Sequence, residues 1–119
     1  HQIGDEVLIQ TAKILRRSIR KTDLISRWGG EEFVIAFIDT HINDAHTITQ
    51  KIREAIEKSE SLEKTIGYNI TASFGLTACN EYDDIDTVIS RADKAMYEAK
   101  QHGKNRVVLA RSQPTEQSS

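Results

Sequence analysis

The fold is decided by the stretch RWGGEEFVIAFID, residues 27–39. Because glycine tolerates positive φ, Gly29 and Gly30 predict a tight two-residue hairpin turn between a short strand at 24–28 and a longer strand at 32–39. The second strand carries apolar side chains on both of its faces, and such a strand is usually covered on both sides. We therefore expect it to lie inside a sheet.

Helical periodicity flanks this hairpin on both sides. The expected elements are helices at 4–20, at 43–58 (capped by Asn43 or Asp44) and between the acidic loop 81–86 and Gly103, strands at 69–79 and 106–110, and a polar connection at 59–67. This order predicts an α+β fold in which helices flank a mainly antiparallel sheet.

The composition fits one domain at residues 1–110, without an internal boundary, and a polar tail at 111–119 that we expect to be disordered. No stretch approaches the run of about 18 apolar residues that a membrane span needs. Lys and Arg number 16 against 18 Asp and Glu, so we expect neither a nucleic acid nor a membrane as a partner of this domain. Cys79 is the single cysteine, which predicts a buried thiol and a reducing, cytoplasmic compartment.

The hairpin tip has residues that suit phosphate chemistry. Gly29 and Gly30 leave the backbone bare, so a phosphate or sugar can approach it closely. Glu31 and Glu32 follow at once, and we expect them to point to opposite faces of the strand. Magnesium is usually held by one or two carboxylates together with substrate phosphates. The alternative is an ordinary hairpin with a charged tip.

Two further pairs of charged residues each have a structural and a functional interpretation. Lys100 and Lys104 lie around the end of the last helix, where they can either favour the helix dipole or neutralise a triphosphate. Arg20 and Asp23 can either close the first helix and its turn, or offer a fork of donors to phosphate and an acceptor to guanine.

The string at residues 27–33 resembles the signature of the GGDEF family of bacterial diguanylate cyclases, in the variant with Glu at the third position. The resemblance runs from residue 4 to about residue 108 and includes SFG at 73–75, ADKAMY at 92–97 and GKNR at 103–106. It implies a fold like the palm of polymerases and nucleotidyl cyclases. It also implies a homodimer in which each subunit binds one GTP, and the two GTP become cyclic di-GMP and two pyrophosphates.

The resemblance implies a role for each residue of the hairpin tip. Glu31 would be a ligand of Mg²⁺, with Mn²⁺ as an alternative, and Glu32 would assist near the 3′-hydroxyl or the metal. The backbone at Gly29 and Gly30 would lie against the nucleotide. Asp5 would hydrogen-bond the guanine edge.

The resemblance also implies phosphate and product contacts. Lys100 and Lys104 would contact the phosphates, although many relatives have Arg at the second position, and Lys loses its bidentate geometry. Arg20 and Asp23 would bind cyclic di-GMP and give feedback inhibition. Some relatives place a further arginine where this chain has Lys51.

The chain departs from the family at its start. The family opens with a helix and a central strand that ends in an Asp metal ligand, followed by an Asn that reads guanine, and the sequence from His1 contains neither. We therefore expect an excerpt of a longer cyclase, membrane-anchored upstream or not, and no GTP turnover by these 119 residues alone. The alternatives are a non-catalytic domain that binds GTP or cyclic di-GMP as a receptor, and a fragment with a structural role.

Overall fold

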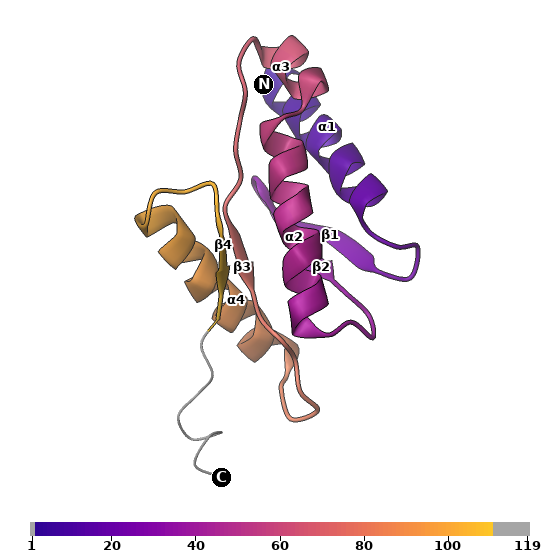
Figure 1. Cartoon of the computed structure of the whole chain (residues 1–119), viewed down its shortest axis with the longest axis vertical. Coiled ribbons are helices and arrows are strands. Elements are labelled where there is room, and N and C mark those ends of the chain that lie inside the picture. Colours follow the sequence, from indigo (N-terminus) through magenta and orange to yellow (C-terminus); the bar gives the residue numbers. More distant parts are fainter. Residues whose placement is uncertain (1, 111–119) are drawn as a thin grey trace. The chain divides into compact units, whose positions relative to one another are not determined.

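The computed structural model describes residues 2–110, and Figure 1 shows their helices and strands. The chain divides after Ala72 into two compact units, which are described separately below. The expected tail at 111–119 lies outside the described residues.

The first unit contains three helices and one hairpin. Its elements are α1 (Gln2–Ser18), β1 (Leu24–Gly29), β2 (Glu32–Ala36), α2 (Ile42–Glu57) and α3 (Glu60–Ile66). Helix α1 contacts both α2 and α3. The side chains that these helices bury against one another are Ile14, Leu15, Ala45, Ile52, Ile56 and Leu62. The apolar periodicity of α1 and α2 is thus what forms this core.

The hairpin differs from the prediction by one residue. Strands β1 and β2 are antiparallel, and Gly29 pairs with Glu32, so Gly30 and Glu31 form the two-residue turn instead of Gly29 and Gly30. Gly30 has φ +45°, a backbone conformation that glycine adopts without the steric cost of a Cβ. Glu31 therefore lies in the turn, and the expectation that both glutamates alternate along a strand is wrong.

The second strand is shorter and less enclosed than predicted. It ends at Ala36, because Asp39 adopts φ +48° in the turn that follows. Within residues 2–110 β2 pairs only with β1, so the expectation of a strand inside a sheet is not met there. Phe33 and Val34 are half-buried, which shows that both faces of β2 are partly covered.

The polar connection expected at 59–67 is instead the helix α3. The Ser59 side chain accepts a hydrogen bond from the backbone N–H of Leu62 at 3.2 Å, and Gly67 ends the helix with φ +84°. Leu62 is fully buried and anchors this short helix. The N-cap of α2 is His41 and not Asn43 or Asp44 as expected. The His41 side chain accepts a hydrogen bond from the Asn43 backbone N–H at 3.1 Å.

The second unit packs one helix on a short parallel strand pair. Its elements are β3 (Phe74–Leu76), α4 (Ile85–Gln101) and β4 (Val107–Leu109), with α4 in contact with both strands. Strand β3 covers only three of the eleven residues expected at 69–79. Gly103, at φ +115°, follows the end of α4 as predicted. Cys79 is exposed, so the predicted buried thiol is wrong, because β3 ends before the sequence reaches it.

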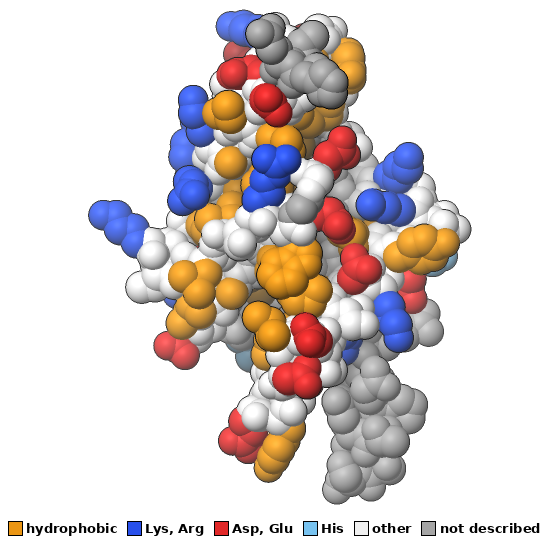
Figure 2. All heavy atoms as spheres, turned by 180° about the vertical axis from the view of Figure 1, so that it is seen from behind, with side chains coloured by type: hydrophobic (Ala, Val, Ile, Leu, Met, Phe, Trp, Pro, Cys, Tyr) orange, Lys and Arg blue, Asp and Glu red, His pale blue; other side chains and the backbone are white. Residues whose placement is uncertain are grey.

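Figure 2 shows exposed side chains of both charge signs on the visible face, in keeping with the balanced composition. No helix among the described residues is long and apolar enough to span a membrane.

Candidate functional site

The hairpin tip is open to solvent. Glu31 and Glu32 are both exposed, and the part of the chain that the structure describes makes no hydrogen bond or ion pair to either carboxylate. No atom lies within 4 Å of the position that a Cβ on Gly30 would occupy. The tip therefore presents two neighbouring carboxylates and a bare backbone to any ligand that approaches it. Within residues 2–110 no three acidic, His or Cys side chains gather as a metal site.

Arg27 holds this tip from the first strand. Its Nε donates a hydrogen bond to the carbonyl oxygen of Gly30 at 2.9 Å. Arg27 is also the cross-strand partner of Phe33, so its side chain leaves the sheet on the same face as the phenyl ring.

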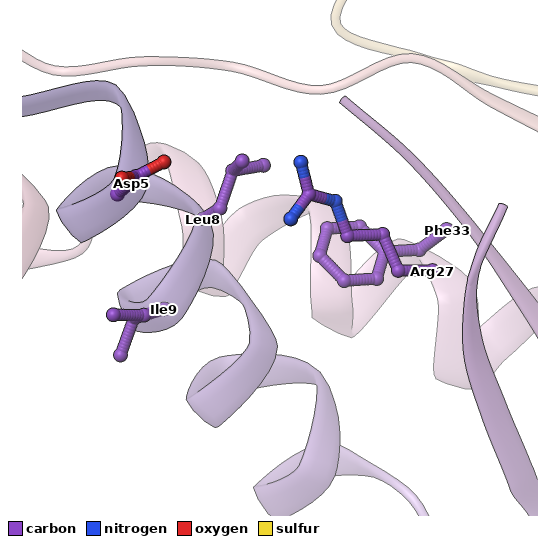
Figure 3. A pocket seen from close by; sticks show the side chains of 5 residues that line it. All are labelled: Asp5, Leu8, Ile9, Arg27 and Phe33. Carbon is purple, nitrogen blue, oxygen red and sulfur yellow. The ribbon is translucent and has the colours of Figure 1, made fainter. Parts of the chain in front are cut away.

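A pocket lies beside the hairpin on that face. It has a volume of about 320 Å³ and is lined by Asp5, Leu8, Ile9, Arg27 and Phe33. Figure 3 shows that the first three come from α1 and that Leu8 points toward the Arg27 guanidinium. Apolar walls with one acidic side chain, Asp5, and one basic side chain, Arg27, suit a flat ligand with polar edges. The volume of the pocket is near the lower limit of known ligand sites. Asp5, the predicted guanine contact, is thus one of the residues that line it.

Arg20 and Asp23 form a closed cluster at the end of α1. The Asp23 carboxylate accepts from Arg20 Nη2 at 3.1 Å, from the Arg20 backbone N–H at 2.9 Å and from the Ile38 backbone N–H at 3.1 Å. Arg20 Nη2 also donates to the Ile38 carbonyl oxygen and to Thr40 Oγ1. The Asp23 side chain is 1% exposed and that of Arg20 is 54% exposed. The cluster therefore ties α1 to the segment after β2, and Arg20 is its accessible member.

The environment of Asp23 favours its charged form. The side-chain hydrogen bond from Arg20 holds the pKa of this carboxyl below its ordinary value of 3.8, and the backbone donors of Arg20 and Ile38 add to the effect. Burial acts in the opposite direction and is outweighed. The same hydrogen bond raises the pKa of Arg20.

The two predicted phosphate-binding lysines lie in the second unit. Lys100 is exposed in the last turn of α4. Lys104 is exposed and has φ +62°, and its backbone N–H donates to the Ala99 carbonyl oxygen at 2.9 Å. The hydrogen bond closes the end of the helix, so the backbone of Lys104 serves the helix end while its side chain stays exposed.

Sequence analysis missed one polar cluster in the second unit. Arg91 donates to both oxygens of Asp83, at 3.2 and 2.7 Å, and to Thr77 Oγ1 and the Ala78 carbonyl oxygen, each at 2.7 Å. The guanidinium lowers the pKa of Asp83 through these hydrogen bonds. The cluster fixes the loop between β3 and α4. Its sequence signal was an arginine on the otherwise apolar face of a helix.

A family model described as "Diguanylate cyclase, GGDEF domain" matches residues 1–106. The chain belongs to this family. Among curated relatives of this GGDEF domain, diguanylate cyclase A of Treponema denticola is 35% identical over 113 residues, which are 94% of this chain and 30% of the relative. The response regulator PleD of Caulobacter vibrioides is 40% identical over 114 residues, 91% of this chain and 24% of PleD. The chain thus spans less than a third of the length of these relatives.

Solved structures of GGDEF domains have the same fold. The active GGEEF domain of a diguanylate cyclase from Vibrio cholerae superposes with a TM-score of 0.83 at 32% identity, covering 95% of this chain and 72% of that one. The GGDEF domain of DgcB from Caulobacter crescentus, solved in complex with c-di-GMP, gives 0.82 at 30% identity, with 94% and 67% coverage. The predicted α+β fold and family resemblance are confirmed.

Proposed function

We propose that this GGDEF domain, in its full-length protein, condenses two GTP into cyclic di-GMP and two pyrophosphates. The observation that carries the proposal is the open hairpin tip, where two carboxylates without a partner among the described residues and the backbone of Gly30 adjoin a pocket that Asp5 lines. In the reaction each 3′-hydroxyl oxygen forms a bond to the α-phosphorus of the other GTP. The bond from that phosphorus to the leaving pyrophosphate breaks, and the hydroxyl loses its proton.

The tip residues fit a hard divalent cation, because exposed carboxylate oxygens are the ligands that magnesium prefers. We assign Glu31 to the cation, Mg²⁺ or Mn²⁺, and Glu32 to the neighbourhood of the attacking hydroxyl or the metal. The metal, when bound, neutralises phosphate charge and lowers the pKa of the hydroxyl. The backbone of Gly29 and Gly30 would lie against the nucleotide.

Other residues would hold the two ends of GTP. Asp5 carries a carboxylate that can accept from the guanine N–H edge, with Leu8 and Phe33 as apolar walls. Lys100 and Lys104 are exposed cations that would neutralise the triphosphate. Because each GTP supplies both an attacking oxygen and an α-phosphorus, we infer that catalysis needs two copies of the domain face to face. GTP as the substrate places the domain in the cytoplasm, whether or not the full-length protein is anchored to a membrane.

We also propose feedback inhibition by cyclic di-GMP at Arg20 and Asp23. Support comes from the accessible Arg20 guanidinium, which can offer donors to a phosphate. Asp23 already accepts bonds from Arg20 and from Ile38, so a guanine contact at Asp23 would require this cluster to rearrange. For the 119 residues alone we propose no turnover, because Glu31 would need further ligands for a catalytic metal.

The test is the product formed by the full-length protein from GTP and magnesium. We expect Glu31→Gln to lower the rate of cyclic di-GMP formation at least about 100-fold, because it removes a metal ligand. Glu32→Gln should also lower it, and the matched change Glu81→Gln, at an exposed loop residue, should leave it unchanged. The same rate of cyclic di-GMP formation in Glu31→Gln, Glu32→Gln and Glu81→Gln would refute the assignment. Unchanged GTP together with cyclic di-GMP binding that is lost in Arg20→Ala would instead establish a receptor.

A further inference from the structure

The hairpin tip has little of its own to hold it in one conformation. Gly30 occupies the positive-φ region and has open space around it. A glycine in such a turn has more conformational freedom than any other residue. The register also shifts between Arg27 and Gly29, so the ladder is irregular just before the turn. A tip that must present its backbone and Glu31 to a ligand therefore needs an additional constraint.

Arg27 supplies that constraint. Within the described residues it is the one side chain with a hydrogen bond to the tip, from Nε to the Gly30 carbonyl oxygen at 2.9 Å. The acceptor belongs to the first residue of the turn, so the bond fixes the orientation of the peptide that leads into Glu31. Loss of the bond would remove this restraint on the Gly30 peptide and leave the turn held by the Gly29–Glu32 pair of the ladder.

Arg27 is an exposed residue that also lines the pocket. It lies opposite Phe33 in the ladder, and both side chains line the pocket. Figure 3 shows the guanidinium between the Phe33 ring and Leu8 of α1. Its Nη1 and Nη2 atoms make no hydrogen bond to residues 2–110. One side chain thus joins the pocket wall to the tip.

We propose that Arg27 is a positioning residue: it holds the Gly30–Glu31 turn in the geometry that the reaction requires. The inference rests on the proposed cyclase activity. It assigns Arg27 no contact with the reacting atoms, since its effect passes through the turn. A misplacement of the catalytic groups by about 1 Å can lower a rate about 100-fold. Because Arg27 acts on the geometry of the turn, its replacement should lower kcat more than it changes KM.

Kinetics of the full-length protein give the first test. We expect Arg27→Ala to lower kcat for cyclic di-GMP formation about 100-fold, with KM for GTP within about threefold of the wild type. Guanidinium ions at a non-denaturing concentration should restore part of the lost rate. The control is Arg17→Ala, which removes an exposed arginine of α1 that has no hydrogen bond or ion pair among the described residues. It should behave as the wild type.

Amide hydrogen exchange gives a second readout that does not depend on turnover. In Arg27→Ala the amides of residues 30–33 should exchange about fivefold faster than in Arg17→Ala, because one net hydrogen bond is lost. Unchanged exchange overturns the proposal even if kcat falls, since Arg27 would then act on the substrate directly. Faster exchange with unchanged kcat also overturns it. A wild-type protein without GTP turnover refutes the cyclase instead, and the exchange result still decides whether Arg27 holds the tip.

Discussion

The replacement of Asp23 by alanine tests how the first unit is held together. The change removes a side chain that is 1% exposed and that accepts from the backbone N–H groups of Arg20 and Ile38. Two backbone N–H groups lose a charged acceptor in part-buried hydrogen bonds, and each such loss costs about 1–2 kcal/mol. Opening of this region should therefore become easier by about 2–4 kcal/mol. Asp23→Asn keeps one oxygen acceptor and should lie between alanine and the wild type.

The measurement is hydrogen exchange of the Ile38 amide in the full-length protein. Since about 1.4 kcal/mol corresponds to a factor of ten, Asp23→Ala should speed this exchange about 30- to 1,000-fold. Asp93→Ala, at an exposed site on α4, is the control and should leave it unchanged. Exchange within about threefold of the wild type would refute the view that Asp23 is a structural tie, and would leave its carboxylate available for a ligand.

Three further outcomes follow from the described packing. Folding lowers the pKa of Asp23, so its contribution to stability is present above the ordinary value of 3.8 and is lost as pH falls through the folded-state pKa. Thermal unfolding should show this loss of stability below about pH 4, and the loss should be less steep in Asp23→Asn. In Gly75→Ala the new Cβ would overlap the Ala92 carbonyl oxygen and the Met96 backbone nitrogen, so α4 must move off β3, and calorimetry should show a loss of at least about 1–3 kcal/mol. Leu62→Ala should cost about 2–5 kcal/mol in urea unfolding, because Leu62 is fully buried; a cost below about 1 kcal/mol would contradict the role of α3 in the core.

The elements with long apolar periodicity could be predicted from the sequence. Helices α1, α2 and α4 and the hairpin were found because each repeats one pattern over enough residues to exclude another. Helix α3 was missed because its seven residues carry one dominant buried anchor, Leu62, although Ser59 and Gly67 had marked its two ends. The length of strand β3 was overestimated, because the alternation of apolar and polar residues continues through residues that pair with no strand in the described chain.

The candidate site could be predicted from the sequence only in part. The glycines and glutamates of the tip could be named from composition and spacing, but which two residues form the turn depends on the register, which the irregularity after Arg27 shifts. Arg27 could not be distinguished from any other strand arginine, because its bond to Gly30 exists only once the hairpin has formed. Asp23 was expected to bind a ligand, but its buried carboxylate already accepts hydrogen bonds from neighbouring residues.

The central claim is that the full-length protein joins two GTP through the open tip at Gly30, Glu31 and Glu32. The most direct measurement is the stoichiometry of products when the protein is incubated with GTP and magnesium and the nucleotides and pyrophosphate are quantified. The account predicts one cyclic di-GMP and two pyrophosphates for every two GTP consumed. Unchanged GTP, or GTP consumed to any other nucleotide, would contradict it.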